Sequence, residues 1–80
     1  MKFLFDKNGV EAVNVAMVRK FYVEQMVFKD GESMACVVAE LPDEEEEIIL
    51  KEFDSEDEEK NFSDAKKYLA DLVKILNGED

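Results

Sequence analysis

The residues of this chain that could do chemistry are carboxylates, and most of them lie between residues 43 and 59. This segment holds eleven acidic side chains and one basic side chain, Lys51, so it carries −10 of the chain's formal net charge of −11. Such a concentration of negative charge repels nucleic acid and acidic membranes, and it attracts cations or a basic protein surface. Two acidic runs are therefore candidate partner-binding residues: Asp43, Glu44, Glu45, Glu46 and Glu47, and then Asp54, Glu56, Asp57, Glu58 and Glu59.

Three interpretations of the acidic runs are open. Solvated carboxylates would keep a small sheet protein soluble and guard a sheet edge near residues 48–50. The runs could instead dock on a basic partner, including a nucleic-acid-binding protein whose groove they fill in place of phosphates. Divalent cation binding is the third, because Asp54, Glu56 and Glu58 alternate. The segment lacks the glycine and the distal glutamate of an EF-hand loop, so we expect no dedicated metal site.

Other catalytic chemistry is sparse in this sequence. Histidine is absent, which removes the commonest general acid, base and metal ligand near neutral pH. Cys36 lies among apolar residues of a predicted strand, where a cysteine usually packs as a small hydrophobe. The serines occupy predicted turns and caps, and the glycines are isolated rather than gathered in a phosphate-binding loop. We therefore expect neither an enzyme nor a bound cofactor.

Length and composition indicate one small domain spanning residues 1–80. No segment approaches the roughly 20 apolar residues of a membrane span. The start at Met1 is too soon charged, at Lys2 and Asp6, to resemble a signal peptide. The single cysteine favours a reduced, cytoplasmic location. The ten lysines and arginines are scattered, so direct binding to DNA or RNA is not expected.

The hydrophobic pattern predicts an α+β fold: an antiparallel β-meander of about five short strands, followed by one C-terminal amphipathic helix packed on one sheet face. Asn8-Gly9 and Asp30-Gly31 predict tight turns, a bend is expected near Ala16–Val18, and residues 43–47 and 54–61 are acidic connections. Asn61 or Ser63 is expected to cap the helix; a weaker cap lies upstream at Ser55–Glu58, but Glu58 and Glu59 interrupt the apolar stripe and favour the later start. The predicted strands are 3–5, 10–15, 19–29, 34–41 and 48–53, and the helical stripe comprises Phe62, Ala65, Leu69, Leu72, Val73 and Leu76.

This order of elements resembles small uncharacterised meander-plus-helix proteins of Gram-positive bacteria and their phages. The resemblance is carried by the apolar start, the Asn8-Gly9 turn, the acidic entry to the last strand and the helix sequence from Phe62 to Leu72. It implies the fold described above. It implies no activity and no functional residue.

The predicted sheet has apolar residues on both faces. In the fourth strand Ala35 and Val37 alternate with Cys36 and Val38, and in the fifth Ile49 and Phe53 are expected opposite Ile48 and Leu50. One helix covers one face, so the other must pack on a second subunit, on a partner, or on a strongly curved sheet that covers itself. The candidate dimer-interface residues are Phe21, Tyr22, Met26 and Phe28.

The sequence thus predicts a small non-enzymatic protein-binding or regulatory protein, dimeric through its sheet. Its predicted partner is a protein, and a basic protein is a candidate. The alternative is an acidic inhibitor that mimics nucleic acid and binds a basic nucleic-acid-binding protein. A partner can be held by the acidic runs or by the apolar sheet face, and salt distinguishes the two. Higher ionic strength weakens binding through carboxylates and leaves apolar contacts intact.

Overall fold

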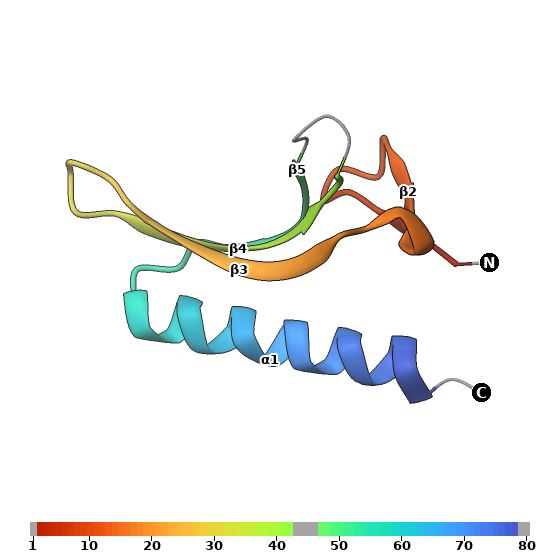
Figure 1. Ribbon diagram of the computed structural model, residues 1–80. Helices are drawn as coiled ribbons and strands as arrows, with labels where there is room; N and C mark the ends of the chain where they lie inside the picture. Colours follow the sequence, from red (N-terminus) through yellow and green to blue (C-terminus); the bar gives the residue numbers. More distant parts are fainter. Residues whose placement is uncertain (1, 43–46, 79–80) are drawn as a thin grey trace.

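A computed structural model describes residues 2–42 and 47–78 of the chain and confirms the α+β class (Figure 1). Antiparallel strands precede a single C-terminal helix, which lies along one face of a curved sheet. No helix in these ranges has the length and apolar character needed to cross a membrane. The elements are β1 (Phe3–Phe5), β2 (Ala12–Asn14), a 3-10 turn η1 (Val15–Met17), β3 (Lys20–Val27), β4 (Ser33–Glu40), β5 (Glu47–Phe53) and α1 (Glu58–Gly78).

The strands form two sheets rather than one continuous meander. β3, β4 and β5 make a three-stranded antiparallel sheet with β4 at its centre, whereas β1 and β2 form a separate two-stranded sheet in the described part of the chain. The break falls at η1, within the bend expected near residues 16–18. The side chain of Asn14 starts this turn, since its Oδ1 accepts a hydrogen bond from the Ala16 N–H at 3.0 Å. A helical turn at this point redirects the chain away from β2.

The two hairpin connections differ in length. In the β3–β4 hairpin the Phe28 carbonyl accepts from Gly31 N–H at 3.0 Å and Phe28 N–H donates to the Glu32 carbonyl at 2.8 Å. Gly31 has φ +90°, which suits glycine, so the expected Asp-Gly turn is present. The turn predicted at Asn8-Gly9 is present as well, since Gly9 has φ +71° and its N–H donates to the Asp6 carbonyl at 3.0 Å. The Asp6 carboxylate also accepts hydrogen bonds from the N–H groups of Val10 and Glu11, which close this longer connection.

The main core lies between β4 and α1. Ala35, Val37 and Ala39 on β4 have no exposed surface, and they pack with Ala65 and Leu72 of the helix. Alanines on both elements let the helix lie close to the sheet. Full burial of a valine such as Val37 contributes about 1.5–3 kcal/mol, so packing between β4 and α1 stabilises the fold.

A β-bulge in β5 changes the expected faces of that strand. Lys51 pairs with Val37 and Ile49 pairs with Val38, which leaves Leu50 as an extra residue. Strict alternation would place Phe53 on the face opposite Leu50. That expectation is wrong: Leu50, Phe53 and Ile48 all pack in the core beneath α1.

The centre of the other sheet face is also buried within one chain. Cys36 is 0% exposed and Val38 is 1% exposed. The sheet is strongly curved (Figure 1), and Lys7 in the β1–β2 connection forms an ion pair of 2.8 Å with Glu52, the β5 neighbour of Cys36. The curved-sheet alternative therefore accounts for these residues without a second subunit.

The helix begins earlier than the stripe of apolar residues suggests. α1 starts at Glu58, and Asp57 caps it by accepting a hydrogen bond from Lys60 N–H at 3.1 Å. The expectation that Asn61 or Ser63 caps the helix is wrong, and the weaker alternative of a cap within Ser55–Glu58 is the one that forms. Glu58 and Glu59 are exposed and lie in the first turn, where the partial positive charge of the helix end favours carboxylates over apolar residues.

Candidate functional site

The outer edge of β3 is the most available binding surface on the sheet. β3 is a terminal strand with eight residues, and all of them pair with β4 on one side only. In an antiparallel pair, successive residues of a strand direct their backbone N–H and C=O groups alternately toward the partner strand and away from it. Phe28, directly after β3, donates its N–H toward the β4 side, to the Glu32 carbonyl. Even-numbered residues of β3 therefore direct their backbone groups inward, whereas Phe21, Val23, Gln25 and Val27 direct theirs outward.

These outward groups have no hydrogen-bond partner within residues 2–42 and 47–78. A row of free N–H and C=O groups on an extended strand is a template for another strand. Of the usual edge protections, β3 has neither a proline nor a bulge in its pairing with β4; its exposed charged side chains are Lys20 and Glu24. We refer to the outward backbone of Lys20–Val27 as the β3 edge.

The opposite edge of the same sheet, on β5, is protected. Lys7 N–H donates to the Ile49 carbonyl at 2.8 Å, so the β1–β2 connection occupies part of this edge. The bulge at Leu50 interrupts its regular spacing, and acidic residues flank the strand at both ends. Natural proteins use such features against unwanted strand pairing. The contrast leaves the β3 edge as the open side of the sheet.

The structure separates the four residues predicted to form a dimer interface. Phe21 lies on the helix side of the sheet and packs against the core. Tyr22 and Met26 lie on the other face, where they pair with Val38 and Met34. Phe28 follows the end of β3 and is 47% exposed. Phe21 is therefore separated by the sheet from Tyr22 and Met26, so the four residues do not form one apolar patch.

Tyr22 is fixed by a charged neighbour. Its hydroxyl donates to Glu47 Oε2 at 2.5 Å, and the Lys20 ammonium lies 5.1 Å from the centre of its ring. The hydrogen bond to Glu47, with burial and the charge of that carboxylate, raises the pKa of Tyr22 to about 12. Glu47, a candidate partner-binding residue, is thus exposed but hydrogen-bonded to Tyr22 of the same chain.

The other acidic candidates fall into two groups. Asp43, Glu44, Glu45 and Glu46 lie outside the described residues. Asp54, Glu56, Asp57, Glu58 and Glu59 are exposed on the β5–α1 connection and the first turn of α1. Two of them also have local contacts: Asp57 caps the helix, and Glu58 accepts a hydrogen bond from Gln25 at 3.1 Å. We refer to these five exposed residues as the acidic cluster.

A buried amide holds the acidic cluster in place. Asn61 is 2% exposed, and its Oδ1 accepts from Ser55 N–H at 2.8 Å and from the Ser55 hydroxyl at 2.6 Å. Its Nδ2 donates to the Ser55 carbonyl at 2.9 Å and approaches Ser33 at 3.4 Å. Sequence reasoning missed this role. The available signal was an asparagine within the apolar stripe of a helix, next to Phe62.

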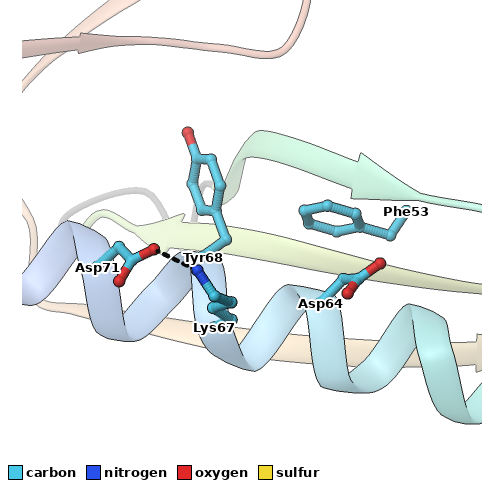
Figure 2. Close-up of a pocket in the computed structure, with 5 residues that line it drawn as sticks. All are labelled: Phe53, Asp64, Lys67, Tyr68 and Asp71. Carbon is cyan, nitrogen blue, oxygen red and sulfur yellow. Dashed lines mark hydrogen bonds and ion pairs between the residues drawn. The ribbon is translucent and has the colours of Figure 1, made fainter.

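A shallow depression of about 220 Å³ lies between the end of β5 and one flank of α1 (Figure 2). Its apolar part is an edge-to-face pair of Phe53 and Tyr68, with ring centres 6.1 Å apart. Its polar part is Lys67, which forms an ion pair of 3.4 Å with Asp71, and Asp64. The depression is open to solvent, so it offers no desolvated carboxylate for acid–base catalysis.

Cys36 has the structural role expected of it. It is fully buried, and burial, followed by the nearby charges of Glu52 and Glu24, raises the pKa of its thiol. A buried thiol with a raised pKa is a poor nucleophile. Within the described part of the chain, no group of three or more cysteines and carboxylates is placed to hold a metal ion.

No protein-family model matches the chain, and comparisons with curated proteins and with solved structures find no significant match. The resemblance to small proteins of Gram-positive bacteria and their phages therefore stays a prediction.

Proposed function

We propose that this chain is a small non-enzymatic protein that binds another polypeptide by strand addition at the β3 edge. One observation carries the proposal: the outward backbone groups of β3 have no hydrogen-bond partner within residues 2–42 and 47–78. In strand addition, main-chain hydrogen bonds supply affinity, and side chains that alternate between the two faces supply specificity. The reduced cysteine is in keeping with a cytoplasmic protein.

The asymmetry of the sheet supports this choice of edge. β5 is bent by a bulge and bonded by Lys7, whereas β3 is regular along its whole length. The side chains beside the β3 edge differ between its faces. Phe21 and Val23 on the helix side are apolar and partly buried, and Lys20 and Glu24 on the other side are charged and exposed. A bound strand would gain both apolar contacts and charge pairing.

Gln25 provides a test that leaves the core intact. Gln25 is exposed, and its backbone N–H points outward, so Gln25→Pro removes one edge donor and places a ring in the path of an incoming strand. Gln25→Ala deletes the same side chain, including its bond to Glu58, and retains the N–H. Each variant would be immobilised and exposed to a cell extract supplemented with untagged protein. The alanine variant should retain a polypeptide that the proline variant loses.

The control is the fold itself, measured as the far-ultraviolet circular dichroism and the thermal midpoint of both variants. Equal retention by two folded variants would contradict strand addition at this edge. Retention by neither variant would contradict it as well, since an available copy or partner should then have bound to Gln25→Ala.

A second proposal concerns the acidic cluster, which would bind a basic surface such as the groove of a nucleic-acid-binding protein. The observation in its favour is the buried Asn61, which holds Ser55 and so keeps the five carboxylates on an ordered connection. Neutralising Glu56, Glu58 and Glu59 to Gln leaves the Asp57 cap in place. A partner held by this cluster should be lost by the neutralised variant and released by salt. A partner retained at high salt by both proteins would contradict this proposal.

A further inference from the structure

We propose that the strand that pairs with the β3 edge is β3 of a second copy, antiparallel, about a two-fold axis that runs perpendicular to the sheet at Val23. This inference rests on the proposed function and names its partner. It yields a continuous six-stranded sheet with both helices on one face.

A perpendicular two-fold axis limits the registers. Paired residues on antiparallel strands point to the same face, so odd-numbered residues pair with odd and even-numbered with even. The axis must then pass through a residue, and the central candidates are Tyr22, Val23 and Glu24. An axis at Tyr22 overlaps only residues 20–24 of each strand. Axes at Val23 and Glu24 each overlap seven residues, 20–26 and 21–27.

Charge separates the two longer registers. An axis at Glu24 sets this exposed carboxylate directly against its own copy, and like charges directly opposite are destabilising. An axis at Val23 pairs the two valines on the helix side and sets Tyr22 opposite Glu24 of the other copy. Lys20 then lies diagonal to that glutamate, within reach of its long side chain. The β3 sequence is therefore self-complementary about Val23.

Backbone geometry agrees with this register. Val23 directs its N–H and C=O outward, as do Phe21 and Gln25. With the axis at Val23, the two valines exchange one pair of hydrogen bonds, and Phe21 and Gln25 exchange two further pairs across the axis. The register thus satisfies the outward groups of Phe21, Val23 and Gln25 in both copies and leaves those of Val27 unpaired. An axis at Glu24 would pair Val27 with Phe21 as well, so charge rather than hydrogen bonding selects Val23.

The flank of α1 next to β3 extends the apolar surface that Phe21 and Val23 form on the helix side of the β3 edge. Tyr68 and Asp71 line the depression beside β5 (Figure 2), and at 100° per residue Phe62, Leu69 and Val73 lie on the opposite flank. Val73 is 41% exposed there. At a strand spacing of about 4.8 Å, helices centred over the two β4 strands would lie about 14 Å apart. Only large side chains bridge the 14 Å between the two helices. Pairing of the β3 strands would therefore contribute more to dimer stability than contacts between the helices.

The first measurement is the mass in solution at tens of micromolar, by sedimentation equilibrium. Wild type and Gln25→Ala should both be dimers. Gln25→Pro removes the Gln25 N–H donor from each of the two Phe21–Gln25 pairs of the dimer. The dimer dissociation constant of Gln25→Pro should therefore be at least about tenfold higher than that of Gln25→Ala. A monomeric wild type would overturn the inference.

The second measurement reads the register with three single cysteine variants, Tyr22→Cys, Val23→Cys and Glu24→Cys, under mild oxidation. With the axis at Val23 the two new thiols at that position have Cα atoms about 5.5 Å apart, which a disulfide spans. Cysteines at 22 or 24 would each be about 8 Å from their own copy, which is too far. The Val23 variant should therefore cross-link fastest, and wild type, whose Cys36 is buried, should not.

The outcomes separate this inference from the proposed function. Fastest linkage at position 22 or 24 would overturn the register. A monomeric wild type, together with a foreign polypeptide retained by Gln25→Ala and lost by Gln25→Pro, would overturn the second copy and leave strand addition standing. A monomer with equal retention by both variants would remove both.

Discussion

Asn61→Ala tests whether one buried amide supports the connection between the sheet and the helix. The substitution removes three hydrogen bonds of 2.6 to 2.9 Å to Ser55. Each contributes about 0.5–1.5 kcal/mol, and alanine regains about 0.5 kcal/mol of helix propensity. We expect a net loss of about 2–3 kcal/mol, from a total of about 4–12 kcal/mol for a domain of this length.

The assay is urea unfolding followed by circular dichroism, with thermal unfolding as a second readout. The thermal midpoint should fall by roughly 10–20 °C. Asn77→Ala is the matched control, because Asn77 lies in the same helix and is exposed. If Asn61→Ala cost no more than this control, the reasoning would be refuted, since the bonds to Ser55 would then be no better than bonds to water.

Asn61→Asp sharpens the test. It keeps the oxygen that accepts from Ser55 and replaces the Nδ2 donor with a second oxygen, 2.9 Å from the Ser55 carbonyl. Two acceptors then face each other in a site that is 2% exposed, so this variant should be less stable than Asn61→Ala at pH 7. Acid should restore part of the loss, because the protonated carboxyl regains a donor.

Two further predictions concern Tyr22 and Gly31. The hydrogen bond to Glu47 raises the pKa of Tyr22 to about 12, above the usual 10. The stability that this hydrogen bond contributes should therefore be complete below pH 10 and lost as the pH rises through 12. In a Tyr68→Phe background, tyrosinate absorbance at 295 nm should show that midpoint, and Glu47→Gln should lower it; an unchanged midpoint would contradict the role of Glu47. Gly31→Ala should cost about 1–2 kcal/mol in urea unfolding, because φ +90° strains any residue with a Cβ while nothing lies within 4 Å of it. Gly78→Ala, where φ is not positive, is the control and should cost nothing, and equal costs at the two glycines would refute the strain argument.

Much of the fold follows from local pattern. The change from two-residue to helical periodicity near residue 60 identifies the single helix, and Asp30-Gly31 identifies the β3–β4 hairpin. The apolar residues on both faces of β4 predict its central position. These features depend on neighbours in sequence, so the sequence displays them directly.

What could not be predicted depends on contacts between distant residues. The bulge at Leu50 has no sequence signal of its own, yet it moves Phe53 to the helix side. The start of α1 is a different case: its cap, Asp57, is a local signal, but Glu58 and Glu59 interrupt the apolar stripe that the prediction followed. The openness of the β3 edge is a property of strand order, which short-range periodicity does not contain.

The bulge at Leu50 also bears on the size that an assembly of this protein can reach. A sheet with two regular edges adds strands at both sides and can extend into a fibre. Here one edge is kinked and partly occupied by Lys7, so only the other can accept a strand. Two copies joined about a dyad would pair both β3 edges, and the joined six-stranded sheet would then end on a bulged β5 strand at each side. Assembly would then terminate by symmetry at two chains.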